Sequence, residues 1–141
     1  MTLITPARLG LMCAACLMAA AVLAFSEEAL AAAPGPCADT VALQQQLNDF
    51  DARWNASDAW GLTERFAPQA SLGTDGGGSR QAVYHQLIEQ LGQPQPRRSS
   101  KLMRATALGD AACLVDVQVV RDGKSAPAVF VLNREGIVAM R

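Results

Sequence analysis

The chain has 141 residues, with 12 lysines and arginines against 13 aspartates and glutamates, which gives a formal net charge of −1. This balance excludes the strongly basic surface of a nucleic-acid-binding protein. Cys13 and Cys16 lie in the apolar N-terminal segment, and the single histidine and the other two cysteines show no spacing typical of a metal site, so no metal is expected.

The first 31 residues have the three parts of a secretory signal peptide. Arg8 provides a positive charge, residues 9–25 are uncharged and apolar, and the alanines that follow allow cleavage after Ala31 or Ala33. We expect bacterial export to the periplasm or the medium, with membrane contact only through this segment before cleavage. The alternative is a retained anchor, because the apolar run reaches the lower limit of about 17 residues for a spanning helix.

Two cysteines remain after cleavage, Cys37 in a lead-in over residues 32–38 and Cys113 further along the chain. In an oxidising compartment, one such pair is typical of a disulfide bond. We therefore predict a Cys37–Cys113 bond that ties the start of the domain, which covers residues 39–141, to a central strand. The alternative is two free and buried thiols.

Capping residues and apolar spacing predict two helices at the start of the domain. The first begins at Asp39 or Thr40, and its apolar face is formed by Leu43, Leu47, Phe50 and Trp54. The second is shorter, begins after Ser57 or Asp58, and carries Trp60, Leu62 and Phe66.

A third helix is predicted between Ser79, which caps it, and Gly92, which ends it. Its apolar stripe is formed by Val83, Tyr84, Leu87, Ile88 and Leu91. His85 falls on the side away from this stripe, so we expect it at the surface.

The second half of the chain has the patterns of strands. They are predicted over residues 99–108, 112–121, 128–132 and 136–140, with a short one over 70–72, and Asp122-Gly123 is typical of a two-residue hairpin turn. The face expected toward the helices consists of Cys113, Val115, Val117 and Val119. This order predicts an α+β fold, with three N-terminal helices on a strongly curved, mainly antiparallel sheet.

Four basic residues lie at the start of the strand predicted over residues 99–108: Arg97, Arg98, Lys101 and Arg104. We interpret this cluster as a solvated strand entry, and the alternative is a phosphate site. Asp116 is expected on the outer side of the sheet, opposite the valines. If a strand is bulged, Asp116 would point inward instead, where Arg104 would meet it or an anionic ligand.

Two segments resemble the nuclear-transport-factor-two-like (SnoaL-like, cystatin-like cone) domains. Residues 50–60 (FDARWNASDAW), then Leu62 and residues 66–70 (FAPQA), are similar to the opening of these domains, and residues 129–138 (VFVLNREGIV) resemble their last hairpin. The similarity extends from about residue 43 to residue 141, and it concerns core and turn residues more than catalytic ones. The resemblance implies a cone with an internal pocket, which family members use for isomerases, dehydratases, epoxide hydrolases, cyclases or binding.

The resemblance also suggests where catalytic residues would lie. Asp75 falls in the loop where steroid-isomerase-like members place a carboxylate base, and Tyr84 would present its hydroxyl to the same pocket. The alternatives are an ordinary Asp-Gly turn for Asp75 and a core position for Tyr84. Phe50 occupies the position of the phenolic oxyanion donor of these enzymes and cannot donate a hydrogen bond, which argues against isomerase activity.

The residues expected to line the pocket are Phe50, Trp54, Trp60 and Arg104, with core packing as the alternative for both tryptophans. No cofactor is expected. We predict a non-catalytic exported module that binds a small apolar ligand in its pocket or forms a homodimer through its sheet face. The alternative is a small lyase, isomerase or cyclase that acts on a hydrophobic substrate with Asp75 as its base.

Overall fold

A computed structural model describes residues 35–73 and 78–141 of the chain. The elements are α1 (Thr40–Asn55), α2 (Ala59–Thr63), β1 (Phe66–Leu72), α3 (Arg80–Leu91), β2 (Arg98–Leu108), β3 (Ala112–Arg121), β4 (Lys124–Asn133) and β5 (Gly136–Met140). The predicted signal segment, its cleavage after Ala31 or Ala33, and Asp75 lie outside the described residues.

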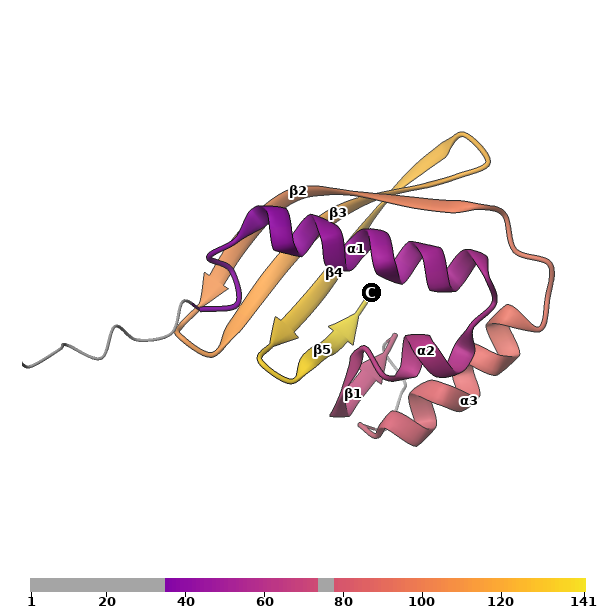
Figure 1. Ribbon diagram of the computed structural model, residues 1–141, viewed down its shortest axis with the longest axis horizontal. Coiled ribbons are helices and arrows are strands. Elements are labelled where there is room, and N and C mark those ends of the chain that lie inside the picture. Colours follow the sequence, from indigo (N-terminus) through magenta and orange to yellow (C-terminus); the bar gives the residue numbers. More distant parts are fainter. Residues whose placement is uncertain (1–34, 74–77) are drawn as a thin grey trace, which may run out of the picture. The chain divides into compact units, whose positions relative to one another are not determined.

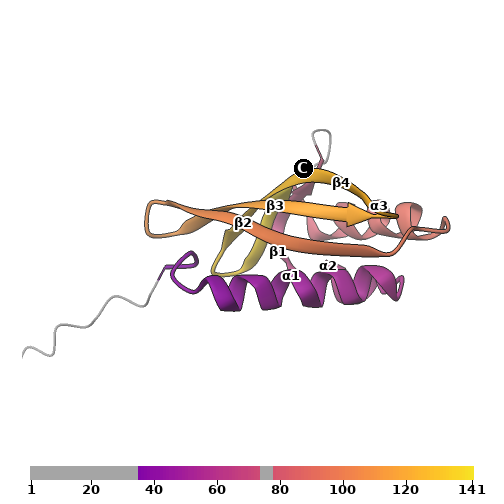
Figure 2. The same ribbon diagram turned by 90° about the horizontal axis from the view of Figure 1, so that it is seen from above.

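The five strands form one sheet in the order β1-β5-β4-β3-β2, shown in Figures 1 and 2. Only β1 and β5 are parallel, and the other pairs are antiparallel. α1 lies against β2, and α3 lies against β1. This arrangement confirms an α+β fold with three helices and a mainly antiparallel sheet, whereas a strong curl of the sheet and an internal pocket stay predictions.

The predicted helix caps and apolar faces are confirmed. The Asp39 carboxylate accepts hydrogen bonds from the Val41 and Ala42 N–H groups at 2.9 Å, and the Ser79 hydroxyl accepts one from Ala82. These bonds satisfy N–H groups that have no partner within the helix. The apolar side chains of α1 and α3 then enter the core beside the valines of β3.

The second helix is shorter than predicted, and Phe66 is the first residue of β1 instead of a helical residue. The reason is a long-range hydrogen bond, because the Arg65 carbonyl accepts from the Ile137 N–H at 2.8 Å and starts the pairing with β5. Phe66 is still completely buried, as its apolar character predicts.

Strand β4 is longer than predicted at its start. Asp122 and Gly123 have φ values of 49° and 74°, so they form a tight turn that pairs Lys124 directly with Arg121. Pro127, which delayed the predicted start to residue 128, is tolerated because β5 pairs with β4 only from Phe130 onward. The first half of β4 is therefore a free edge on that side, where a missing N–H costs little.

The alternation predicted for β3 is confirmed, since Cys113, Val115, Val117 and Val119 are all buried. Cys113 forms a disulfide bond with Cys37, and their Cα atoms are 5.3 Å apart. The predicted bond is thus present, and it holds the segment before α1 against the central strand of the sheet.

Candidate functional site

Two of the predicted site residues lie together at the surface. The Trp60 ring is 63% exposed and packs edge-on against Tyr84, with ring centres 5.7 Å apart. Their helices α2 and α3 are neighbours, which explains the contact. Neither side chain lines the hollow described below. His85, beside Tyr84 on α3, is exposed as expected.

The other predicted pocket residues are divided between the core and the outer face. Phe50 and Trp54 are buried, and Phe50 packs edge-on against Phe130 at 5.6 Å. Arg104 lies on the outer face of the sheet and forms an exposed ion pair with Asp116, with 2.8 Å between Nε and Oδ2. A bulge between Leu102 and Arg104 does occur in β2, but it brings this pair together in solvent and not inside the fold.

The interpretation of the basic cluster as solvated is wrong for one of its members, Arg98, which is 3% exposed. Its Nε donates to Asp51 Oδ1 at 2.8 Å, and the Ser100 hydroxyl donates to the same oxygen at 2.8 Å. The guanidinium carbon lies 4.9 Å from the centre of the Phe50 ring. Burial of a charged side chain is costly, so this pairing is what makes the inward position of Arg98 tolerable.

Two amide side chains of α1 fix the backbone that carries Arg98. Asn55 accepts from the Arg98 N–H at 2.7 Å and donates to the Arg98 carbonyl at 2.8 Å. Gln44 donates to the Ser100 carbonyl at 3.0 Å and accepts from the Leu102 N–H at 2.8 Å. Because β2 is an edge strand, these bonds use backbone groups that would otherwise lack partners, and they hold α1 against the strand.

Arg98 belongs to a row of three cations across one end of the sheet. In the strand register, Arg98 is opposite Arg121, and Arg121 is opposite Lys124. Directly opposite residues lie on the same face, and Arg121 continues the inward alternation of the β3 valines. Arg98, Arg121 and Lys124, named the cation row below, therefore all lie on the helix side of the sheet.

The electrostatic environment of Arg98 is unfavourable for its charge. Burial lowers the pKa of the Arg98 guanidinium from its ordinary value, the neighbouring Asp51 carboxylate opposes this shift, and the positive charge of Arg121 adds to it. Both guanidinium carbons lie 5.2 Å from the Trp54 ring centre, so the two cations share one aromatic neighbour. Asp51 thus pairs with a buried guanidinium, Arg98, that also faces a second, half-buried cation, Arg121.

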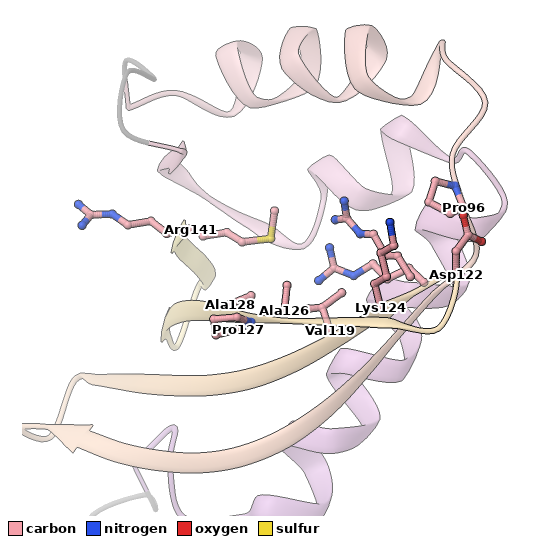
Figure 3. A pocket seen from close by; sticks show the side chains of 11 residues that line it. Pro96, Val119, Asp122, Lys124, Ala126, Pro127, Ala128 and Arg141 are labelled. Carbon is pink, nitrogen blue, oxygen red and sulfur yellow. The ribbon is translucent and has the colours of Figure 1, made fainter.

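The cation row borders a hollow with a volume of about 500 Å³, the size of a small-molecule site. Figure 3 shows its floor, where Val119, Ala126 and Ala128 lie along the strands, while Pro96 approaches from the connection before β2. The hollow is named the β3–β4 hollow below. The hollow forms because α1 and β5 do not cover the start of β4. The short side chains of the alanines on the inner face also leave space above the strands.

Several buried polar atoms around this hollow have no hydrogen-bond partner within the described part of the chain: Arg98 Nη2, Arg121 Nε and Trp54 Nε1. Arg98 and Arg121 line the β3–β4 hollow, and Arg121 and Trp54 also line an adjoining hollow beside α3. Gln86 lines that second hollow too, and its buried Oε1 atom is likewise unpartnered there. Buried polar groups in native proteins normally have partners, so these atoms make the two hollows the candidate site.

The sequence contains a signal for this site that is separate from any motif. Asp51 lies on α1 between the buried positions Leu47 and Trp54, where a charged residue interrupts an apolar stripe. Arg121 has the same parity as Val119, which is an inward position. Two different elements thus each carry a charged residue at a core position. This pattern predicts a buried ion pair or a ligand site.

Across residues 35–73 and 78–141, no group of three or more histidine, cysteine, aspartate and glutamate side chains is placed to hold a metal ion. Within the same residues, no helix has the length and apolar character needed to cross a membrane.

No family model matches the sequence, and no curated protein matches it either. Among solved structures, it is similar to a domain of unknown function with a cystatin-like fold from Nostoc punctiforme, with a TM-score of 0.59, 17% identity, and coverage of 73% of this chain and 75% of that one. A variant of the protein Rd1NTF2_05 matches with a TM-score of 0.54, 14% identity, and coverage of 71% and 95%. At these identities the likeness concerns the fold alone, and the described domain has a nuclear-transport-factor-two-like, cystatin-like fold.

Proposed function

We propose that this chain is an exported, non-catalytic binding module whose β3–β4 hollow receives a small ligand. The observation that carries the proposal is the presence of unpartnered N–H groups of Arg98 and Arg121, both buried, at the edge of a hollow with an apolar floor. Small-molecule sites typically combine an apolar lining with a few polar groups that fix the ligand. The hollow has both features.

The alternative enzyme hypothesis has less support from the described residues. Its second catalytic residue, Tyr84, packs against Trp60 near the surface and away from the cation row. Phe50, at the position of the oxyanion donor in steroid-isomerase-like relatives, is buried and has no donor group. A binding module requires neither residue, so we favour binding over catalysis.

A thermal-shift screen against a metabolite library tests the proposal, with two variants as filters. Ala126→Trp fills the hollow, whereas Ser125→Trp places the same ring on the opposite face of the same strand. Both positions are exposed, so both variants should fold. We expect a ligand that stabilises the natural protein and Ser125→Trp but not Ala126→Trp.

Two results of this screen would contradict the proposal. One is a ligand set that stabilises all three proteins equally, because binding would then occur elsewhere. The other is chemical conversion of the identified ligand by the purified protein, which would favour the enzyme alternative. Ligand recovered unchanged after prolonged incubation is the expected outcome.

Export is the second part of the proposal and has its own test. N-terminal sequencing of the protein recovered from the periplasm or the medium should give a start at Ala32 or Pro34, the residues after the two cleavage positions. An intact Met1 in the exported protein would contradict cleavage and favour the retained anchor.

Self-association through the outer sheet face is a further proposal. Met103 on the bulge of β2 is exposed there, beside the Arg104–Asp116 pair and a shallow hollow that reaches Val129. Sedimentation equilibrium should detect a dimer, and Met103→Glu should dissociate it. A natural protein that sediments as a monomer would contradict this proposal without affecting the ligand site.

A further inference from the structure

We infer that the ligand of the β3–β4 hollow is a small carboxylate with an apolar body, whose charged group is held by Arg98 and Arg121. This inference rests on the proposed binding function and adds to it the charge and the orientation of the ligand. It differs from the sequence-based expectation of an apolar ligand. Three features of the hollow support this inference: the surrounding charges, the unpartnered donors and the apolar floor.

The charges on the inner face do not balance at this end of the sheet. The cation row contributes three positive groups, and Asp51 is the one carboxylate that forms an ion pair with the row among the described residues. Asp122 also lines the hollow, but it lies exposed on the turn and makes no ion pair with these cations there. Like charges directly opposite one another destabilise a sheet, so an anion in the hollow would relieve this arrangement.

The unpartnered donors match the geometry of a carboxylate. Asp51 uses the Nε of Arg98, which leaves the buried Nη2 of the same guanidinium free of a partner within the described residues. Arg121 supplies a second buried donor, Nε, from the adjacent strand. A carboxylate has two oxygens that accept hydrogen bonds from separate donors, and arginine is the side chain best suited to recognise it.

The floor of the hollow favours an organic anion over an inorganic one. Val119, Ala126, Ala128 and Met140 provide apolar surface beside the cations. Inorganic phosphate or sulfate would gain nothing from that surface, whereas a carboxylate with a short hydrocarbon chain would bury its chain there while its charge meets the arginines. The positions of the charged and apolar groups therefore define the orientation of the ligand, with its carboxylate at the arginines and its hydrocarbon chain on the floor.

The test compares hexanoate with hexanamide, which has the same chain without the charge. Nuclear magnetic resonance titrations of the purified exported protein at low salt would follow the backbone amides of Ala126 and Ala128, and calorimetry would give the affinities. Hexanoate should shift these amides and bind about tenfold or more tightly than hexanamide, since hydrogen bonds to a charged group are stronger than neutral ones.

Two charge variants locate the contact. Arg121→Gln removes a cation of the row and should weaken hexanoate binding by about tenfold. Lys101→Gln is the matched control, because it removes one positive charge from the outer face of neighbouring β2, where Lys101 is opposite Gln118. Hexanoate should bind Lys101→Gln as it binds the natural protein. Ala126→Trp should abolish the response of the Ala128 amide.

The outcomes separate this inference from the proposed function. If hexanamide binds these residues as tightly as hexanoate, and Ala126→Trp blocks both, the hollow is a binding site but the carboxylate assignment is overturned. Inorganic phosphate that binds there as tightly as hexanoate also overturns it, because the apolar floor would then have no role. Absence of any response to hexanoate overturns the inference as well, while the metabolite screen with Ala126→Trp decides separately whether the hollow binds a ligand.

Discussion

Arg53, which is part of α1, and Arg98, which packs against α1, have opposite surroundings. Arg53 is at the surface, where it pairs with Asp49 at 3.2 Å and with Asp58 at 3.0 Å, and Asp49 also pairs with Arg65. Arg98 is buried, pairs with Asp51 alone, and faces Arg121. The hydrogen bond that Arg53 donates to Asp49 raises the pKa of Arg53, while burial lowers the pKa of Arg98.

The surface ion pairs form a network with matched charges, whereas the buried ion pair belongs to a network with unmatched charges. The surface cations, Arg53 and Arg65, are matched by the two carboxylates Asp49 and Asp58, so that network needs no further partner. The buried network has more cations than carboxylates and leaves donors unpartnered in the part of the chain that the structure describes. An imbalance that costs stability is a common property of binding sites. Four measurements test whether the two networks differ in this way.

Asp51→Ala should have the largest effect, because it leaves the Arg98 charge buried without its carboxylate. We expect the free energy of unfolding to fall by about 3–5 kcal/mol, measured by urea denaturation with circular dichroism. Asp49→Ala on the surface side of the same helix is the control, and it should change stability far less. Equal losses for the two variants would mean that burial does not distinguish the networks.

The double variant Asp51→Leu with Arg98→Met removes the buried charges together. We expect it to recover most of the loss and to lie within about 1–2 kcal/mol of the natural protein in the same denaturation experiment, since apolar residues of similar volume often replace a buried ion pair well. A double variant as unstable as Asp51→Ala would show that the lone charge is not the cause of the loss.

Asn55→Ala should have an intermediate effect, because it removes both hydrogen bonds between α1 and the backbone of Arg98. The expected loss is about 1 kcal/mol, and hydrogen exchange of the β2 amides should increase locally. Gln46→Ala, on an exposed part of the same helix, is the control and should leave those amides protected. If both variants behave alike, Asn55 does not position Arg98.

Arg121→Gln should have the smallest effect and the opposite sign. Removing one cation of the row should raise the free energy of unfolding by about 0.5 kcal/mol at low salt, and the gain should shrink as salt screens the charges. Thermal unfolding at two ionic strengths would measure it, with Lys101→Gln as the neutral control. A loss of stability at both ionic strengths would contradict the excess of positive charge.

Local chemistry made several features of this domain predictable. Asp39 and Ser79 cap their helices through neighbouring N–H groups, and Asp122-Gly123 forms a turn because these two residue types tolerate positive φ. The buried valines of β3 followed from simple alternation. Cys37 and Cys113 are the two cysteines outside the predicted signal segment, so the bond between them could be predicted without knowledge of the fold.

The site was not predictable in the same way. Tyr84, Trp60 and Arg104 were chosen from their positions on a predicted helix or strand. In the structure Trp60 and Arg104 are exposed, and Tyr84 is half-buried against Trp60. Asp51 and Arg98 were missed because their partners lie on different elements. Neither a helix stripe nor a strand pattern reveals which buried charge will meet which.

By itself, the sequence determined where helices begin, where the hairpin turns and which face of β3 is apolar, because each of these depends on residues within a few positions of one another. Tertiary structure alone decided that Arg98 would be buried on Asp51 and opposite Arg121. These pairings join residues from separate elements, so they depend on strand register and on how α1 packs. The same packing leaves the start of β4 uncovered, and this is why the cations border a hollow.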